Sequence, residues 1–327
     1  MKPVIELRSV ERSFVTEPDF ADRVASIFGA KSNAKTLRAV DGIDLTIGQG
    51  EVVGLVGESG CGKSTLGRIV AGILPQDKGD VLFNGRALVD KNKLKNGSGL
   101  GIQMILQNPA SALDPRQKII DAIAEAPLAH GLVHRSEARE FALRALKSVG
   151  LGEDALERFP HEFSGGQRQR ICIARALAVD PRVVVCDEAV ASLDVSIQAQ
   201  IINLFLDLKQ ELNLSYLFIS HDISVVEHVA DRIAVMYLGQ IVEIGETKEL
   251  LENPQHPYTK ALLAEVPTLD TTLSEEHVLR GELPSLLTPP SGCRFHTRCP
   301  VATSACSSQR PTLEPWKGDH QVRCHQI

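Results

Sequence analysis

The chain has 327 residues, of which 43% are hydrophobic and 23% charged, and its formal net charge is -6. This length accommodates one large domain with an added region, or two domains. The acidic balance argues against a general nucleic-acid-binding protein, which usually has a basic excess. No apolar run approaches the roughly 18 residues that span a bilayer, and the first residues lack the apolar stretch of a signal peptide. We therefore expect a cytosolic protein whose thiols stay reduced.

Strand-like and helical patterns alternate along the chain, which predicts an α/β fold with a mainly parallel sheet. The chain opens on a predicted strand. Buried parallel strands, nearly continuous in apolar residues, are expected at 51–57, 182–188 and 215–221. Residues 232–245 predict two short antiparallel strands around Gly239. The pattern is helical between about 108 and 178, and the region 256–327, rich in proline and cysteine, is predicted to be distinct from a first domain at 1–255.

One segment near the start interrupts two predicted strands. Within residues 16–37, one face of a predicted short helix carries the apolar side chains of Phe20, Val24, Ile27 and Phe28. Two interpretations stay open for this helix: it packs on the surface of its own domain, or it contacts a protein in a membrane.

A glycine-rich loop joins the first buried strand to a helical pattern. Its sequence, GESGCGKST at 57–65, fits a Walker A phosphate-binding loop. Glycines permit the tight turn that points backbone N–H groups at phosphate oxygens, and the helix adds its positive end. Nucleotide contacts are expected from Gly57, Ser59, Gly60, Gly62, Lys63, Ser64 and Thr65. Lys63 would bind the terminal phosphates and the Ser64 hydroxyl would bind Mg²⁺, so the loop predicts a site for a nucleoside triphosphate.

Two carboxylates, Asp187 and Glu188, stand at the end of the second buried strand. Side chains at the carboxyl end of a parallel strand lie in the crevice where doubly wound folds bind ligands. Asp187 would help to hold Mg²⁺, which prefers oxygen ligands, and Glu188 would orient or deprotonate the attacking water. Acidic pairs are common in turns, and it is the Walker A loop about 120 residues upstream that favours the catalytic interpretation.

A second phosphate-binding helix start is predicted in the stretch EFSGGQRQRICIARALAVDP. Ser164 is expected to cap this helix, and Gly165 and Gly166 to expose backbone N–H groups at its positive end. A single P-loop enzyme needs only one such terminus, so the second requires an explanation. The motif FSGGQ resembles the ABC signature LSGGQ, with Phe163 in place of leucine and Gln167 completing the motif.

Further landmarks of the ABC ATPases follow in the correct order. Gln107 in MILQNP is similar to the Q-loop glutamine, Asp194 ends an ASLD sequence similar to the D-loop, and His221 is placed like the switch histidine. Phe14 is placed like the aromatic residue that stacks on adenine. By this resemblance, over about residues 5–260, the chain is identified as a member of the ABC ATPases. The resemblance implies a P-loop (RecA-like) α/β core with an antiparallel β part and a helical subdomain.

In this family two nucleotide-binding domains pack head to tail. The resemblance therefore implies that Ser164, Gly165 and Gly166, with Gln167 beside them, close over ATP held by the P-loop of a partner. Asp194 is also carried over as a nucleotide-site residue. This arrangement accounts for the second helix terminus, since each chain completes the site of the other.

The same resemblance assigns roles around the γ-phosphate. Glu188 would activate water, and Gln107 and His221 would sense the phosphate. Gln107 is also expected to join Ser64 as a ligand of Mg²⁺. The family usually has proline after the catalytic glutamate, and this chain has Ala189 instead; we expect its effect to be local, because the carboxylate is intact.

The C-terminal region resembles that of the ATP-binding subunits of dipeptide and oligopeptide importers, where His256-Pro257-Tyr258-Thr259 is a recurrent signature. This implies a peripheral protein on the cytoplasmic face of the inner membrane. Its partners would be a homologous ATP-binding subunit, two permeases and an extracytoplasmic substrate-binding protein, with no nucleic acid. Another cargo, such as a nickel chelate, an opine, glutathione or an oligosaccharide, stays open, as does a soluble ABC ATPase acting on ribosomes or DNA.

Four of the seven cysteines lie near the C-terminus: Cys293, Cys299, Cys306 and Cys324. Their gaps of five, six and seventeen residues exceed the short pairs common in zinc sites. Varied spacing suits a [4Fe–4S] cluster, and the resemblance favours these four thiols as its ligands. Zinc and metal-free thiols are the alternatives. The expected role is structural, because this segment has few apolar residues with which to bury a core.

The other three cysteines are scattered. Cys61 lies in the Walker A loop, where a helix N-terminus is expected to lower the pKa of its thiol; this predicts alkylation that ATP blocks. Cys172 and Cys186 are expected to be buried as small hydrophobic residues.

Overall fold

The main layer of the computed structural model is an eight-stranded sheet with the order β13-β14-β12-β11-β3-β10-β9-β8. The structure describes residues 2–16, 35–90, 93–94, 98–265 and 282–327. The strands of this sheet are β3 (Val52–Val56), β8 (Ile102–Ile105), β9 (Val183–Asp187), β10 (Ser215–Ile219), β11 (Arg232–Tyr237), β12 (Gln240–Glu246), β13 (Glu314–Lys317) and β14 (His320–Val322). β8, β9, β10, β3 and β11 run parallel, and β12, β14 and β13 extend the sheet with antiparallel pairs.

The three predicted buried strands are confirmed as β3, β9 and β10, which are neighbours in the sheet. Every residue of these strands is buried, which explains their continuous apolar sequences. The antiparallel pair predicted around Gly239 is confirmed as β11 and β12. β11 also pairs in parallel with β3, so this hairpin belongs to the central sheet.

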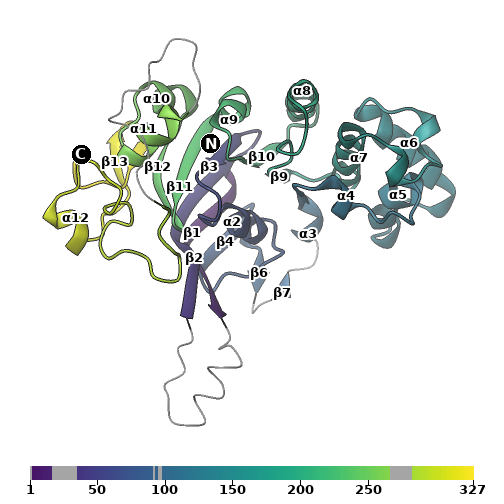
Figure 1. The fold of residues 1–327 in the computed structure, drawn as a ribbon. Helices are drawn as coiled ribbons and strands as arrows, with labels where there is room; N and C mark the ends of the chain where they lie inside the picture. Colours follow the sequence, from purple (N-terminus) through teal and green to yellow (C-terminus); the bar gives the residue numbers. More distant parts are fainter. Residues whose placement is uncertain (1, 17–34, 91–92, 95–97, 266–281) are drawn as a thin grey trace, which may run out of the picture.

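A second sheet has the order β2-β1-β4-β5 and is antiparallel. Its strands are β1 (Pro3–Thr16), β2 (Lys35–Gly48), β4 (Lys78–Phe83) and β5 (Arg86–Ala87), and a separate small ribbon is formed by β6 (Val89–Asp90) and β7 (Lys93–Leu94). Apolar side chains of β1 and β2 share one core with helix α2 (Lys63–Val70) and with Val53 and Leu55 of the central sheet. Figure 1 shows β1 and β2 as a long ribbon that crosses beneath the central strands.

Helices fill the region between 108 and 178, as predicted. They are α4 (Pro109–Ala112), α5 (Ile119–Ala129), α6 (Ala138–Ser148) and α7 (Gly165–Leu177). Ile123, Leu146 and Ile171 of the last three helices belong to one buried cluster. Figure 1 shows this helical group at the right of the molecule, beyond α3 (Ser98–Gly101) and β9. The remaining helices are α8 (Val195–Leu212), α9 (Ile223–Val229), α10 (Thr247–Glu252), α11 (Pro257–Ala264) and α12 (Ser304–Ser308).

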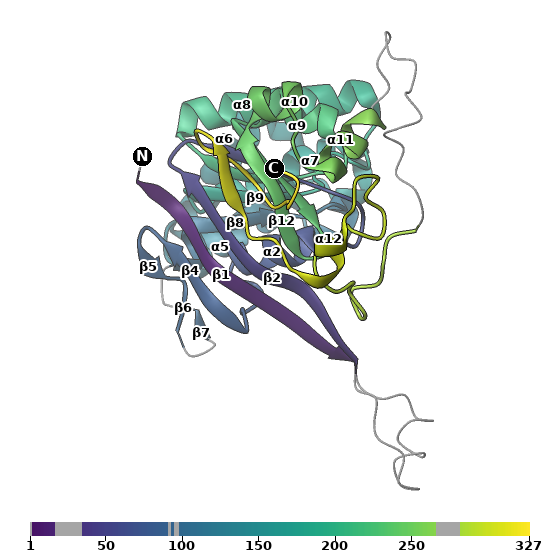
Figure 2. The same cartoon turned by 90° about the vertical axis from the view of Figure 1, so that its left-hand side faces the viewer.

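The C-terminal region packs into the same core as the central sheet and the helical group. β14 pairs with β12, with Val322 opposite Glu243, and Figure 2 shows this part of the chain lying along β12. Tyr258 and Phe295 are buried in the cluster that also contains the helical group. The predicted helix at 20–28 lies outside the described residues. Within the described part of the chain, no helix combines the length and apolar character needed to cross a bilayer.

A buried carboxylate ties the start of α11 to the sheet. Glu243 on β12 is fully buried and accepts hydrogen bonds from the backbone N–H groups of Gln255 and His256, at 2.7 and 3.0 Å. The Nε2 atom of His320 lies 2.7 Å from the same carboxylate. The Nδ1 atom of His256 accepts the N–H of Tyr258 at 3.0 Å and thereby caps α11. The start of the signature His256-Pro257-Tyr258-Thr259 is thus a helix cap built on a buried glutamate.

Acidification is expected to destabilise the fold through His256. Burial lowers the pKa of His256 to about 4 from an ordinary value of 6.5, against the opposing pull of Glu243. Between pH 6.5 and 4 the imidazole of His256 is therefore protonated in the unfolded chain and neutral in the folded chain. The contribution of the neutral His256 to stability should be complete above pH 6.5 and should decrease as the pH falls from 6.5 to 4. The free energy of unfolding should decrease by about 3 kcal/mol over this range, which urea unfolding at a series of pH values would measure. His256→Asn keeps a capping side chain without the titration and should flatten this slope, whereas parallel curves for both proteins would contradict the assignment.

Candidate functional site

The Walker A loop connects the end of β3 to the start of α2, and its glycines are sterically required. Gly57 has φ 151° and Gly62 has φ 111°. A Cβ atom at Gly57 would lie 2.2 Å from the carbonyl oxygen of Met236, and one at Gly62 would lie 2.1 Å from that of Ala39. The loop is therefore pressed between β11 and β2, and only glycine fits at these two positions.

The side chain of Lys63 folds back over the Walker A loop. Lys63 is buried, and its Nζ atom donates to the carbonyl oxygens of Gly57 and Glu58 at 2.6 and 3.0 Å. Ser59 and Gly60, at the turn of the loop, are exposed. The ammonium charge is thus fixed at the loop that precedes the positive end of α2, which is the arrangement that attracts phosphate groups.

Two of the three predicted Mg²⁺ ligands, which come from distant parts of the chain, are in contact. The Ser64 hydroxyl, at the start of α2, donates to the Asp187 Oδ1 atom at 2.8 Å. Burial raises the pKa of Asp187 and Glu188 raises it further, while the Ser64 hydrogen bond lowers it. A hydroxyl and a carboxylate side by side are oxygen ligands of the kind that Mg²⁺ takes. Thr65, the last predicted residue of the loop, follows in α2.

Three predicted catalytic residues meet at Glu188. The Gln107 Nε2 atom donates to Glu188 Oε2 at 2.7 Å, and His221 Nδ1 lies 3.4 Å from Glu188 Oε1. These residues follow β8, β9 and β10, which are adjacent parallel strands. Because the carboxyl ends of parallel strands lie at one edge of a sheet, the topology itself brings them together. Gln107 is placed at Glu188, and its predicted contact with Mg²⁺ stays a prediction.

The backbone at Glu188 has an unusual conformation. Its φ is 51°, in the left-handed region that residues other than glycine rarely adopt. The Glu188 N–H donates to the carbonyl of Ile219 at 3.0 Å, which holds the turn against β10. Ala189, next in the chain, is buried. Strain of this kind is kept where the surrounding structure fixes a functional side chain, and here it aims the Glu188 carboxylate at Gln107 and His221.

The signature motif begins α7, and the predicted cap is confirmed. Ser164 Oγ accepts the Gln167 N–H at 3.3 Å, and Gln167 Oε1 accepts the Ser164 N–H at 3.1 Å, which forms a capping box. Ser164 and Gly165 are exposed. A Cβ atom at Gly166 would lie 2.5 Å from Ile197 of α8, so this glycine also serves packing between the two helices. Figure 1 shows α7 in the helical group and α2 beneath the central strands.

Two further predicted nucleotide contacts lie on exposed positions. Asp194 is the N-terminal flanking residue of α8 and makes no side-chain cap hydrogen bond. Phe14 is 38% exposed, and the guanidinium of Arg12 lies 5.1 Å from its ring centroid. Phe14 is paired with Leu37 on β2, the strand whose Ala39 carbonyl meets the Walker A loop. The roles of Asp194 and Phe14 stay predictions.

The predicted reactivity of Cys61 is wrong. Its side chain is fully buried, and burial raises the pKa of its thiol, which outweighs the lowering effect of Lys63. A protonated, inaccessible thiol does not react with alkylating reagents at neutral pH. Cys172 and Cys186 are buried, as predicted.

The four C-terminal thiols gather in one loop-rich segment. The Cys293 N–H donates to the Cys306 carbonyl at 2.8 Å, and the Cys306 thiol lies 3.4 Å from the Thr303 hydroxyl. Cys299 and Cys324 interact electrostatically with the other thiols. Among the described residues, however, no group of three or more His, Cys, Asp or Glu side chains is placed as a metal-binding set. Four thiols in one segment have the chemistry that a thiolate-bound metal requires, but in this structure they are not gathered around one point.

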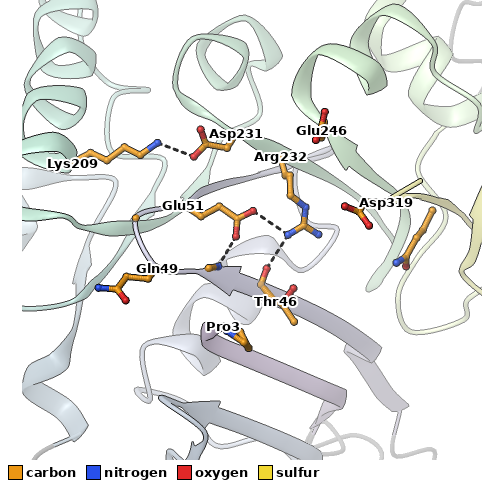
Figure 3. Close-up of a pocket in the computed structure, with 12 residues that line it drawn as sticks. Pro3, Thr46, Gln49, Glu51, Lys209, Asp231, Arg232, Glu246 and Asp319 are labelled. Carbon is orange, nitrogen blue, oxygen red and sulfur yellow. Dashed lines mark hydrogen bonds and ion pairs between the residues drawn. The ribbon is translucent and has the colours of Figure 1, made fainter. Parts of the chain in front are cut away.

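A pocket of about 680 Å³ lies at the opposite end of the central sheet from the Walker A loop. Its lining includes residues that precede or begin β3 and β11, and four of its charged side chains form two ion pairs, as Figure 3 shows. Arg232 binds Glu51 at 3.1 Å, and Lys209 binds Asp231 at 2.8 Å. Glu246 and Asp319 also line the pocket, so acidic side chains outnumber basic ones there, and the pocket is separate from the predicted nucleotide site.

Three residues that contact or form the Walker A loop escaped the sequence analysis. The Glu58 N–H donates to the Tyr258 hydroxyl at 2.9 Å, across 200 residues of chain. The Glu58 carboxylate accepts from Arg298 at 2.8 Å, across 240 residues. No local pattern signals contacts of such long range, although Tyr258 belongs to the signature that identified the C-terminal region.

Comparison with known proteins agrees with the motifs and the two regions identified above. A family model described as "ABC transporter" matches residues 40–191, and one described as "Oligopeptide/dipeptide transporter, C-terminal region" matches residues 242–306. The oligopeptide transport ATP-binding protein AppF of Bacillus subtilis is 44% identical over 98% of this chain and 97% of its own length. The oligopeptide transport ATP-binding protein OppF of Escherichia coli is 48% identical over 90% of this chain and 89% of its own. The resemblance stated from the motifs is confirmed.

Solved structures show the same fold. The structure of cbiO1 from Clostridium perfringens, part of the ABC transporter complex cbiONQ, has a TM-score of 0.62 at 24% identity and covers 77% of this chain and 92% of its own. A dimeric ATP-binding cassette in a post-hydrolysis state, bound to ADP and Pi, has a TM-score of 0.60 at 25% identity, over 74% of this chain and 98% of its own. The predicted P-loop α/β core is therefore confirmed as a fold.

Proposed function

Because this chain belongs to the ABC transporter family, in the group that carries the oligopeptide and dipeptide transporter C-terminal region, we propose that it hydrolyses ATP to drive the import of peptides through a membrane complex. One observation carries the proposal. Ser64 contacts Asp187, and Gln107 and His221 contact Glu188, the next residue in the chain; these contacts support a joint site for Mg²⁺ and the attacking water. The choice of peptides as cargo is supported by the names of the relatives.

In the proposed reaction the Walker A loop binds the phosphates of ATP. Lys63 supplies a fixed positive charge, and the N–H groups at the start of α2 supply further donors. Mg²⁺, when bound, neutralises charge on the β- and γ-phosphates, and Ser64 and Asp187 are the residues that would hold it. The metal ligands and phosphate donors thus orient the γ-phosphate toward Glu188.

Water activation is assigned to Glu188. Its carboxylate is held from two sides, by the Gln107 amide and by the His221 ring, so one oxygen can be directed at a water in line with the γ-phosphate. Gln107 and His221 are assigned the role of detecting that phosphate. Because both side chains contact Glu188, loss of the γ-phosphate would change the contacts of the catalytic carboxylate and the positions of the residues that follow β8 and β10.

The second phosphate-binding terminus is assigned to a partner chain. Ser164 and Gly165 are exposed at the positive end of α7, and Asp194 is exposed at the start of α8. We propose that a homologous ATP-binding subunit packs here, so that each chain closes over the ATP of the other. Two permeases and an extracytoplasmic binding protein would complete the importer, with this chain peripheral on the cytoplasmic face of the inner membrane.

The C-terminal thiols are proposed to bind a [4Fe–4S] cluster, with zinc as the alternative. The support is that Cys293, Cys299, Cys306 and Cys324 lie in one segment and interact with one another. These residues would hold the metal as thiolates and fix a loop-rich segment to the sheet. Three states are distinguished when iron, acid-labile sulfide and zinc are measured in protein purified without oxygen: the iron–sulfur cluster, bound zinc and metal-free thiols. Absence of iron, sulfide and zinc would overturn the proposal.

The proposed function is tested by purification of the tagged chain from detergent-solubilised membranes without oxygen. Two permease-like proteins and a second ATP-binding chain are expected to co-purify. Vesicles that contain this complex should hydrolyse ATP faster when the binding protein and its peptide are added. Recovery with ribosomal or DNA-repair proteins would contradict the transport function, and hydrolysis that responds to a non-peptide cargo alone would contradict the choice of cargo.

A further inference from the structure

We infer that the C-terminal region is a positioning element for the Walker A loop, with the Tyr258 hydroxyl and the Arg298 guanidinium fixing Glu58. This inference rests on the proposed ATP site and adds to it two positioning residues from outside the ATPase motifs. Neither residue is assigned a contact with nucleotide. Their proposed effect is on ATP affinity, through the shape of the loop.

Glu58 is held at every polar group that it carries. Its backbone N–H donates to Tyr258 at 2.9 Å, and its carboxylate accepts from Arg298 at 2.8 Å. Its carbonyl accepts from Lys63 Nζ at 3.0 Å and from the Cys61 N–H at 3.3 Å. The C-terminal region thus contacts a loop residue whose carbonyl, together with that of Gly57, fixes the phosphate-binding lysine.

Tyr258 is an immobile support for this contact. Its ring is fully buried, and ring centroids of Tyr237 and Phe295 lie 4.6 and 5.4 Å away. Its backbone N–H is taken up by His256, and His256 is in turn bonded to the buried carboxylate of Glu243. A side chain packed on all sides at the start of a capped helix has one orientation, so its hydroxyl fixes the Glu58 N–H in space.

Arg298 approaches the loop from the cysteine-rich segment. Its side chain is only 5% exposed, whereas the Glu58 side chain is 23% exposed, and the Arg298 guanidinium lies 6.0 Å from the ring centroid of Tyr237. A nearby arginine of the same segment, Arg294, binds Asp41 and the Leu238 carbonyl. Asp41 is two residues beyond Ala39, whose carbonyl presses on Gly62.

The C-terminal region therefore braces both ends of the loop. Tyr258 and Arg298 fix Glu58, the residue after the first glycine of the loop. Arg294 fixes β2, whose Ala39 carbonyl lies against Gly62. A phosphate cradle made of backbone N–H groups binds tightly only when these groups are already aligned, because ordering them on binding weakens affinity. The C-terminal region is thereby given a role in ATP binding.

Tyr258→Phe tests this inference, because it removes the acceptor of the Glu58 N–H and little volume. We expect the dissociation constant of the full chain for ATP, measured by calorimetry in EDTA, to rise about tenfold. In the assembled complex KM for ATP should rise by a similar factor while kcat changes less than about twofold, as expected for loss of uniform binding. The thermal midpoint of the variant should stay close to that of the unaltered chain.

Tyr216→Phe is the matched control. Tyr216 is also buried, and its hydroxyl has no hydrogen-bond partner among the described residues, so ATP affinity should not change. A second test uses Arg298→Met and Glu58→Gln, whose effects on ATP affinity should be far from additive, while Arg298→Lys should restore most of the affinity lost with Met.

The outcomes separate this inference from the proposed function. If the unaltered chain does not bind ATP, the proposed ATP site is wrong. If it binds ATP and Tyr258→Phe binds equally well, the positioning role is overturned. A lowered thermal midpoint with unchanged ATP affinity would overturn it as well, since that result marks a merely structural residue. Additive effects of Arg298→Met and Glu58→Gln would remove Arg298 from the positioning element.

Discussion

Replacement of Glu188 by glutamine is expected to abolish nearly all ATP hydrolysis and to leave ATP binding intact. Glutamine has the shape of glutamate, so it can keep the contacts with Gln107 and His221 that now measure 2.7 and 3.4 Å. It cannot accept a proton from water, and a positioned general base contributes roughly 10²- to 10⁴-fold to rate. We expect kcat to fall by about 10³-fold in the assembled complex, measured as phosphate release, with an ATP dissociation constant within about threefold of that of the unaltered chain.

The comparison needs a glutamate outside the site. Glu227, exposed on α9, has none of the predicted roles, and Glu227→Gln should leave both hydrolysis and binding unchanged. Undiminished turnover by Glu188→Gln in the assembled complex would refute the role of Glu188. In a pair of unlike ATP-binding subunits, single-turnover hydrolysis at this chain's own site keeps that result interpretable, because the partner's site can turn over independently.

The catalytic arrangement could be predicted because each of its residues is marked by the strand before it. Gln107, Glu188 and His221 each lie just beyond an apolar run, and parallel strands end at a common edge. The contact between Ser64 and Asp187 follows from the same rule, since β9 and β3 flank β10. Sequence order and strand polarity were sufficient for this part of the site.

The contacts of the C-terminal region could not be predicted in this way. Glu58 meets Tyr258 and Arg298 across 200 and 240 residues, and neither partner lies on a periodic pattern that aims it at the loop. The prediction for Cys61 failed for a related reason. It considered the local field of the α2 terminus alone, whereas burial beneath the surrounding elements has the larger effect on the thiol. Long-range packing decided both cases.

Asp41→Ala is expected to be the most destabilising substitution among those considered for the fold. Asp41 on β2 and Arg294 of the C-terminal region are each only 6% exposed and form a direct ion pair. Burial lowers the pKa of Arg294 to about 10, and Asp41 opposes this shift. Removal of the carboxylate would leave Arg294 charged and buried, with its hydrogen bond to the Leu238 carbonyl remaining. Breaking such a pair costs about 4 kcal/mol, which urea unfolding of the full chain would measure as a lower midpoint.

Two comparisons decide whether this cost comes from the buried charge. Glu140→Ala breaks the ion pair with Arg144 on α6, whose side chains are 77% and 61% exposed, and it should change stability by less than about 0.5 kcal/mol. Addition of Arg294→Met to Asp41→Ala removes the unpaired charge and should recover about 2 kcal/mol relative to additivity. Arg310 also binds Asp41, at 2.6 Å. A loss below about 1 kcal/mol for Asp41→Ala would show that the stability of the fold does not depend on the pairing of Arg294 with this carboxylate. The C-terminal region would then be held to β2 chiefly by packing, and the brace on the Gly62 side of the Walker A loop would be weaker than the one at Glu58.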